Sequence, residues 1–334
     1  MNLPHISNKT ILISALDWGF GHTSRCVPII NQLLRFNNRI IFAGNSQQCT
    51  FIKKEFPSIR TEFIDGYNVK LNSNKNTYFQ ITNQLFKVSK AFKNELKWVG
   101  KFVAINKIDL ILSDNRYGFR NTNVKSIFIG HQLNLQLPKF ENTVNRILNH
   151  KINQFNSVWI IDDENINLAG TLSNPLGLTI PYIYIGLLSR FKVINQVSIY
   201  DYLIIISGPD PENIIFLKKI ENLFNSLNYK IAIVSTVKSS FKLGDCDCDY
   251  FYFPSTVLLN QLFCQSKTII SKAGYTTLME LLLLNKKAIL MPTKGQFEQE
   301  YLAKTIKNDL FKFIDNIESV KRLIKKSELK SLNI

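Results

Sequence analysis

Short apolar runs alternate with amphipathic segments along almost the whole chain of 334 residues. Apolar runs of this length are typical of strands buried on both faces, and their alternation with helical patterns predicts an α/β protein with largely parallel sheets. The expected strands of a first set are Thr10–Ala15, Arg39–Gly44, Ile108–Asp114, Lys125–His131 and Ser157–Asp162, followed by Pro181–Phe191 as a last strand that enters a linker.

A second set of strands follows this linker. They are expected at Asp201–Gly208, Tyr229–Thr236, Tyr250–Phe253, Lys267–Gly274 and Lys286–Pro292, with helices near Pro211–Asn225, Thr256–Cys264, Thr276–Leu284 and Glu298–Asn308. The sequence therefore predicts two doubly wound domains, residues 1–190 and 191–334, that face each other across a cleft. The chain should end in a frayed helix that could pack back on the first domain.

Composition narrows the class of protein. Apolar residues make up 45% and charged residues 20% of the chain, as in globular proteins. Neither an apolar run of about 18 residues nor a signal-peptide pattern is present, so we expect a cytoplasmic protein. The five cysteines are scattered, which indicates reduced thiols.

The formal net charge of +16 allows a nucleic acid, an anionic membrane surface or an anionic substrate as partner. A general bias toward Lys, Asn and Ile is the alternative explanation. Because no nucleic-acid-reading motif is present, binding to nucleic acid is disfavoured.

One lysine row exceeds the general bias. Within residues 86–103, five lysines recur at helical spacing on one face, opposite an apolar face: Lys87, Lys90, Lys93, Lys97 and Lys101. This pattern fits either a solvated face of a helix packed on its own core or a basic surface that rests on anionic lipid headgroups.

The turn after the first strand, residues 17–24, contains the sequence Gly19-Phe20-Gly21-His22. The dinucleotide fingerprint requires Gly or Ala at position 24, which is Ser here, and an acidic residue after the second strand, where Asn45 stands. A nicotinamide site is therefore disfavoured. The turn can instead bring backbone and the His22 ring close to a ligand, or His22 can cap the following helix.

Two further strand ends carry polar residues. Asp114 and Arg116 follow one strand, and His131 ends the next. Since ligands of open α/β sheets bind at the carboxyl ends of strands, His131 competes with His22 as a base, and Asp114 could orient either ring or cap a loop.

Polar groups also gather at two strand ends of the second domain. Ser271 and Gly274 lie between a strand and a helix that carries Glu280, and Gly295 precedes a polar helix start with Gln296, Glu298, Gln299 and Glu300. Carboxylates and amides pair well with sugar hydroxyls.

Gly274 with Glu280, then residues 299–303 (Gln-Glu-Tyr-Leu-Ala), resemble the C-terminal nucleotide-sugar site of glycosyltransferase family 28, the family of the peptidoglycan N-acetylglucosaminyltransferase. The turn ending in His22 is similar to that family's Gly-rich turn, and the layout matches its GT-B fold of two Rossmann-like domains. Residues 60–110 and 136–190 carry no motif that can be matched.

The resemblance implies a role for each site. Glu280 would hold the ribose of a uridine nucleotide, Gln299 and Glu300 would bind the donor sugar, and His22 would deprotonate the acceptor. The helix start after Gly274 would face the diphosphate. The implied donor site comprises Ser207, Gly208, Ser271, Gly274, Tyr275, Thr276, Glu280, Gln296, Gln299 and Glu300, and the acceptor-side loop comprises Gly19, Gly21 and Arg116.

Two stretches depart from the family pattern. The loop from Ser207 to Glu212 contains two prolines and two acidic residues where the family has a glycine-rich loop. Residues 244–249 contain both Asp-x-Asp and Cys-x-Cys, but without a second ligand pair they fit a solvated acidic loop. The family needs no metal ion, since a helix dipole and backbone donors stabilise the leaving diphosphate.

The resemblance implies an inverting, metal-independent glycosyltransferase. It would move a sugar, such as an N-acetylhexosamine, from a UDP-sugar to a hydroxyl of a cell-envelope glycan or glycolipid at the inner face of the plasma membrane. Two alternatives stay open: a UDP-sugar 2-epimerase of the same fold, and an inactive protein that binds nucleotide sugars.

Overall fold

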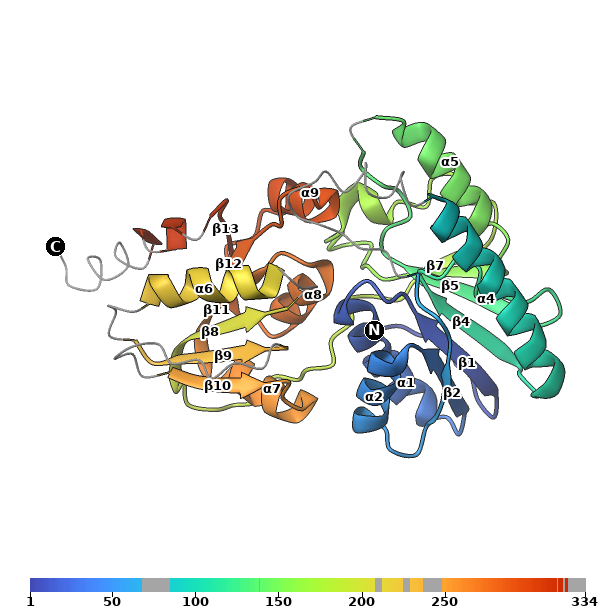
Figure 1. Ribbon diagram of the computed structural model, residues 1–334, viewed down its shortest axis with the longest axis horizontal. Coiled ribbons are helices and arrows are strands. Elements are labelled where there is room, and N and C mark those ends of the chain that lie inside the picture. Colours follow the sequence, from blue (N-terminus) through green and yellow to red (C-terminus); the bar gives the residue numbers. More distant parts are fainter. Residues whose placement is uncertain are drawn as a thin grey trace. The chain divides into compact units, whose positions relative to one another are not determined.

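The computed structural model describes residues 1–67, 85–137, 139–207, 212–224, 229–236, 248–316, 318–320 and 322–323. The chain divides into two compact units, Met1–Arg190 and Phe191–Ile334. In each unit helices flank a central sheet (Figure 1). Among the described residues, none of the helices is both long and apolar enough to cross a membrane.

The first unit contains a seven-stranded sheet with strand order β3-β2-β1-β4-β5-β6-β7. Its strands are β1 (Thr10–Ala15), β2 (Arg39–Gly44), β3 (Arg60–Phe63), β4 (Leu110–Asp114), β5 (Lys125–Gly130), β6 (Ser157–Ile160) and β7 (Tyr182–Tyr184). Each neighbouring pair runs parallel. Its helices are α1 (Phe20–Leu34), α2 (Ser46–Glu55), α4 (Leu85–Ile105), α5 (Glu141–Ile152) and the 3-10 helix η1 (Gly170–Ser173).

The second unit contains a six-stranded sheet with strand order β10-β9-β8-β11-β12-β13, also with parallel neighbours. Its strands are β8 (Tyr200–Ile206), β9 (Ile231–Ser235), β10 (Cys248–Tyr252), β11 (Ser266–Lys272), β12 (Lys287–Met291) and β13 (Phe311–Phe313). Its helices are α6 (Glu212–Phe224), α7 (Thr256–Cys264), α8 (Tyr275–Leu283) and α9 (Phe297–Thr305).

The predicted α/β fold with two doubly wound parallel sheets is confirmed. Two edge strands, β3 and β13, were not expected, because they are short and mixed in polarity. The run after residue 181 forms only the three-residue strand β7. The expected last helix lies mostly outside the described residues, although Val320 packs into the core of the second unit.

Apolar side chains alternate between the two faces of each sheet and pack it against the helices. Leu12, Ile41 and Ile111 project from three neighbouring strands onto one face of the first sheet, where they pack against Val99 and Phe102 of α4. Ile11 and Ile13 alternate with Leu12 and so point to the opposite face. Complete burial of an aliphatic side chain contributes about 1.5–3 kcal/mol, so these faces fix the register of the sheet.

The strand order reverses direction between β1 and β4. The chain continues from β1 to β2 on one side, and from β4 to β5 on the other. This arrangement opens a crevice at the carboxyl ends of the two strands, where Ala15 pairs with Asp114. The equivalent position in the second sheet lies between β8 and β11.

Candidate active site

His22 and Asp114 meet at the switch point of the first sheet. His22 lies in the first turn of α1, which follows β1, and Asp114 is the last residue of β4. The His22 Nδ1 atom lies 2.7 Å from Asp114 Oδ1. Asp114 is fully buried, whereas the His22 side chain is 17% exposed. The contact with Asp114 thus fixes the orientation of the His22 ring, while part of the side chain stays accessible.

Arg25 completes this cluster and was not anticipated from the sequence. Its Nε donates to Asp114 Oδ2 at 2.5 Å, and a terminal nitrogen donates to the other carboxylate oxygen. The second terminal nitrogen lies 2.9 Å from His131 Nδ1. Arg25 lies on α1 and is buried. Through these hydrogen bonds its guanidinium connects Asp114 to His131.

The two histidines differ in what they can do. A guanidinium only donates, so Nδ1 of a neutral His131 must accept from Arg25 and the ring proton sits on Nε2. His22 has the reverse arrangement, since Nδ1–H donates to the Asp114 carboxylate and Nε2 keeps its lone pair. These tautomers follow from the hydrogen-bond partners. They favour His22 over His131 as a general base.

The electrostatics keep His22 neutral and Asp114 ionised near neutral pH. Burial, followed by the Arg25 charge, lowers the pKa of His22 below its ordinary value of 6.5, although Asp114 opposes this shift. Burial alone would raise the pKa of Asp114, but the combined effect of Arg25 and His22 outweighs burial and lowers it. A neutral imidazole beside a carboxylate is the resting form that a base requires.

The glycines of the opening turn have different functions. Gly19 is the N-cap of α1 with φ of 91°, a conformation that strongly favours glycine. Gly21 already belongs to the helix. His22 lies inside α1, and its Nδ1 atom contacts Asp114.

Arg116 lies in the interior of the first unit. Its Nε donates to Glu95 Oε1 at 2.5 Å, and a terminal nitrogen donates to the Asp65 carbonyl at 2.7 Å. Arg116 is fully buried, and Glu95 also accepts from the Tyr67 hydroxyl. This geometry gives Arg116 a structural role beneath the crevice and disagrees with a direct contact to an acceptor.

In the second unit, Ser271 lies near the end of β11, and Gly274 is the N-cap of α8. Gly274 has a φ of −73°, which any residue can adopt, so the turn itself does not require glycine. A Cβ atom added there would meet open space, which leaves the backbone at the start of α8 accessible. Tyr275 is buried at the first helical position, so it can offer only backbone to a ligand.

Thr276 and Glu280 lie one turn apart on the same face of α8. Glu280 is 4% exposed. A buried carboxylate is costly unless it is hydrogen-bonded or paired, and such groups are frequent in functional sites.

Gln296, Gln299 and Glu300 form one network at the carboxyl end of β12. Gln299 Oε1 accepts from the Thr293 backbone N–H at 2.9 Å, and its amide nitrogen donates to Gln296 Oε1. Glu300 Oε1 accepts from the Gly295 N–H at 2.7 Å. These three side chains of the implied donor site thus hold the loop in front of α9.

Thr293 adds a polar group to this loop. Its hydroxyl is buried and has no hydrogen-bond partner among the described residues. Gly295 has a φ of 84°, so this position favours glycine.

Some of the residues predicted from the sequence lie outside the described residues. These are Gly208 and residues 244–247. Ser207 is exposed just after β8. Among the residues that the structure describes, no cluster of three or more potential metal ligands occurs. The four described cysteines are free thiols: Cys26, Cys49, Cys248 and Cys264.

The lysine row lies on α4. Lys90, Lys93, Lys97 and Lys101 are exposed, whereas the Lys87 side chain lies outside the described residues. On the opposite face of the same helix, Val99 and Phe102 pack into the core.

Comparison with known proteins identifies the second unit. Residues 233–328 match the model of the glycosyltransferase family 28 C-terminal domain. The second unit carries a family 28 domain. This match includes all the donor-site residues expected from the sequence except Ser207 and Gly208. The resemblance to family 28 is thereby confirmed for this stretch, and with it the prediction of a glycosyltransferase.

Solved structures share the fold over nearly the whole chain. Spinosyn Rhamnosyltransferase SpnG is similar with a TM-score of 0.63 and 13% identity, covering 98% of this chain and 92% of that one. Phytolacca americana UGT2, complexed with UDP-2fluoro-glucose and pterostilbene, has a TM-score of 0.62 and 10% identity, with 97% and 90% covered. Acinetobacter baumannii MurG has a TM-score of 0.53 and 12% identity, with 96% and 90% covered.

A search of curated protein sequences finds no match to this chain. The structural similarities establish the GT-B fold, and the stretch that matches the family 28 domain includes β11 and β12.

Proposed function

We propose that the chain transfers a glycosyl group from a UDP-sugar to an acceptor hydroxyl, with inversion at the anomeric carbon. The observation that carries this proposal is the pairing of His22 with Asp114 at the switch point of the first sheet. A family 28 domain supplies the candidate donor site on the same chain.

His22 would act as the base. Its Nε2 takes the proton of the acceptor hydroxyl while the acceptor oxygen attacks the anomeric carbon. The bond from that carbon to the diphosphate oxygen breaks, and UDP leaves with the electron pair. Asp114 stabilises the imidazolium that forms, as a carboxylate behind a catalytic histidine does in other enzymes.

The donor would bind to residues of the second unit. Backbone N–H groups at the start of α8 face the diphosphate, where the helix dipole favours negative charge, and no metal ion is required. Glu280 binds the ribose hydroxyls. Gln299 and Glu300 exchange their present backbone partners for hydroxyls of the sugar. Support for a UDP-sugar comes from the neighbour that holds UDP-2fluoro-glucose.

The acceptor would be a cell-envelope glycan or glycolipid at the inner face of the plasma membrane. The exposed lysines of α4 support this part of the proposal, since each basic residue near an anionic lipid surface contributes about 1 kcal/mol to binding.

The test is calorimetric titration of UDP into the intact protein in the presence of EDTA. We expect binding that is lost in Glu280→Ala and kept in Glu318→Ala, because Glu318 is an exposed carboxylate of the same unit. Failure of the intact protein to bind UDP, or a requirement for added metal, would overturn the donor assignment.

A second assay separates transfer from epimerisation. The protein is incubated with a UDP-sugar alone, and the sugar is analysed by chromatography. Conversion to a 2-epimer without acceptor would favour the epimerase and contradict the proposal.

A further inference from the structure

Gln48 is a buried amide that contacts both sides of the opening turn, which leads from β1 to α1. It is the third residue of α2 and is 3% exposed. Its Nε2 donates to the carbonyls of Ala15 and Leu16 at 3.0 and 3.3 Å, and to the Thr23 hydroxyl at 2.9 Å. One side chain therefore joins the segment before His22 to the residue that follows it.

The partners of Gln48 fix which end of its amide carries the oxygen. Its Oε1 accepts from the Asn45 backbone N–H at 3.1 Å, whereas two carbonyls, which can only accept, face the nitrogen. The Asn45 side chain accepts in turn from the Gln48 backbone N–H at 2.9 Å, which completes a capping box at the start of α2. A glutamate would serve this box equally well, so the box does not account for the amide nitrogen.

The end of β2 provides the room for this side chain. Gly44 is the last residue of β2, and a Cβ atom there would lie 3.0 Å from both the Cβ and the Oε1 atom of Gln48. It would also lie 2.8 Å from the Phe42 ring. A larger residue at this position would therefore push the Gln48 amide away from the end of β1.

The first turn of α1 benefits from an anchor of this kind. Gly19 stands at the N-cap and has no side chain that could accept from the first turn of the helix. His22 lies in this turn. Thr23 is fully buried, so its hydrogen bond to Gln48 lies in the interior and fastens the start of α1 to α2.

The other contacts of the Gln48 amide lead to Asp114. The Leu16 N–H donates to the Asp114 carbonyl at 2.9 Å, and the Leu16 carbonyl accepts from Gln48. Gln48 is thus bonded to the residue next to His22 and to a residue that is itself bonded to Asp114. We propose that Gln48 is a positioning residue that sets the orientation of the His22 ring toward Asp114.

The importance of this orientation for catalysis rests on the proposed function, in which His22 is the base. The orientation itself is a property of the resting protein. It can therefore be measured without a donor or an acceptor.

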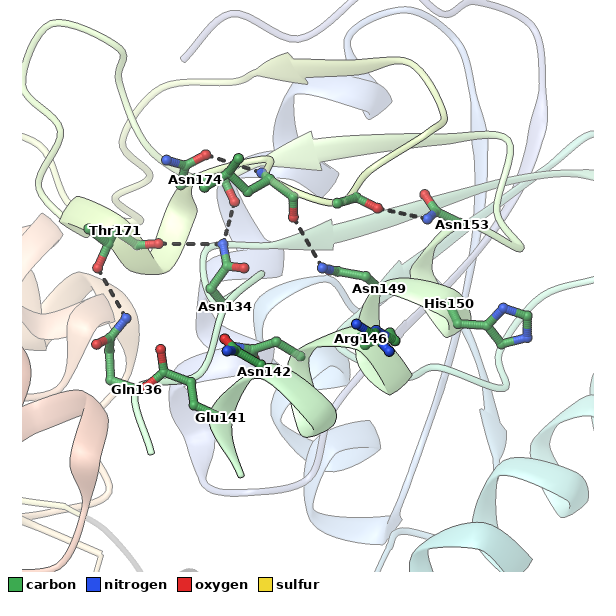
Figure 2. A pocket seen from close by; sticks show the side chains of 13 residues that line it. Asn134, Gln136, Glu141, Asn142, Arg146, Asn149, His150, Asn153, Thr171 and Asn174 are labelled. Atoms are coloured by element: carbon green, nitrogen blue, oxygen red, sulfur yellow. Dashed lines mark hydrogen bonds between the residues drawn. The ribbon is translucent and has the colours of Figure 1, made fainter. Parts of the chain in front are cut away.

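Amide side chains also fasten parts of the first unit that lie outside the candidate site. An open pocket of about 660 Å³ lies beside α5, and there Asn149 and Asn153 donate to the carbonyls of Leu176 and Gly177 (Figure 2). These contacts join α5 to the segment after η1. An amide that fastens a loop is therefore not by itself part of a site, and what distinguishes Gln48 is that its partners flank His22.

Asn38 provides a matched control, because it makes the same kinds of contact at the opposite ends of β1 and α1. Its Nδ2 donates to the Ile6 and Leu33 carbonyls at 2.7 and 2.8 Å, and its Oδ1 accepts from the Lys9 N–H at 2.9 Å. Asn38 is buried as well. Loss of either amide leaves buried backbone groups without a partner, so both variants should lose stability for the same reason.

The experiment compares Gln48→Met with Asn38→Leu in the full-length chain. The histidine rings are labelled with ¹⁵N, and two-bond ¹H–¹⁵N correlation spectra report which ring nitrogen carries the proton. His22→Ala assigns the signal. The native His22 ring should carry its proton on Nδ1, because this nitrogen faces the Asp114 carboxylate. Gln48→Met should lose this single tautomer, and Asn38→Leu should keep it.

Turnover provides a second measurement. Gln48→Met should lower kcat by about 10–100-fold, because a misplacement of about 1 Å can cost about 10²-fold. The Kd for UDP should stay unchanged, since Gln48 lies in the first unit. Asn38→Leu should keep the native value of both constants.

A second pair of variants keeps the test decisive if Gln48→Met does not fold. Thr23→Val removes one acceptor of the Gln48 amide and leaves the capping box of α2 intact. Thr23→Ser keeps the hydroxyl. The His22 tautomer should change in Thr23→Val and stay native in Thr23→Ser.

Unchanged His22 spectra in Gln48→Met and Thr23→Val would overturn the proposal. Equal changes in Asn38→Leu would overturn it too, because a general loss of stability would then suffice. If the native protein transfers no sugar, the proposed function fails, yet the spectra still decide the role of Gln48. Normal turnover and unchanged spectra in Gln48→Met count against Gln48 alone and leave the proposed function supported.

Discussion

His22 Nδ1 lies 2.7 Å from Asp114 Oδ1, although the two residues are 92 positions apart in the sequence. The pair forms because β1 and β4 are neighbours in the sheet and end at the same edge. Arg25 donates to both oxygens of the same carboxylate, so the ring orientation of His22 depends on Asp114 of β4 and on Arg25 of its own helix.

Replacement of the proposed base is the most direct prediction. His22→Ala should lower turnover by about 10²–10⁴-fold, because proton transfer by a positioned side chain typically contributes that factor. Binding of UDP should be unchanged. Steady-state kinetics and calorimetry check both statements, with His5→Ala as a control at an exposed histidine of the same unit. Unchanged turnover in His22→Ala would assign the base elsewhere, with His131 as the first candidate.

The pH dependence of turnover should follow the lowered pKa of His22. The base works only when deprotonated, so activity is lost as pH falls through its pKa, which lies below 6.5. The rate should therefore hold down to about pH 6.5 and decline only below it. A decline that already begins at pH 7.5 would contradict this environment for His22.

Arg25 should set the position of that decline. Arg25→Gln removes a cation that lowers the pKa of His22 while Asp114 continues to raise it, so the acid limb should move to higher pH. Arg25→Lys retains the charge and should leave the limb closer to that of the native protein. Identical pH–rate profiles for the native protein and the Gln variant would refute the electrostatic role of Arg25.

The Glu95–Arg116 ion pair should matter for stability. Arg116→Met leaves the buried Glu95 carboxylate without its cation, which should cost about 3–5 kcal/mol of unfolding free energy. The double variant with Glu95→Leu removes both charges and should cost less. The exposed pair of Arg60 with Glu62 provides the control, since Arg60→Met should cost under about 1 kcal/mol. Denaturant titration measures all three, and equal costs for both single variants would contradict the prediction.

The lysine row of α4 should determine any binding to lipid. Sedimentation with vesicles containing phosphatidylglycerol should show binding at low salt that weakens as salt increases. Replacement of Lys90, Lys93, Lys97 and Lys101 by Gln should abolish it. Binding of the native protein to neutral vesicles at the same strength, or to neither type, would show that this face is only solvated.

Much of the site could be predicted because strand ends are visible in the sequence. Asp114 and His131 end apolar runs, and parallel strands bring their carboxyl ends to one edge. Arg25 could not be predicted, since a charged residue within a helical pattern is normally assigned to the solvent face, yet it is 2% exposed. Its burial depends on Asp114, which is distant in sequence.

The same reason explains which strands could be predicted from the sequence. The central strands are apolar runs, whereas β3 has the sequence Arg-Thr-Glu-Phe and lacks such a signal. Among the strands that the structure describes, β3 pairs with β2 alone, at the edge of the sheet. The sequence gives no local signal for the partner of α5, because this partner is the loop beyond β6.

The placement of β1 between β2 and β4 also has a consequence for synthesis on the ribosome. The Thr10 N–H donates to the Asp109 carboxylate, 99 positions later, so β1 cannot be completed as an inner strand until about a third of the chain has been translated. Until then the nascent first unit exposes one edge of β1 and holds His22 without Asp114. Protection of β1 amides from hydrogen exchange should therefore arise in the same kinetic step as the ordering of the His22 ring.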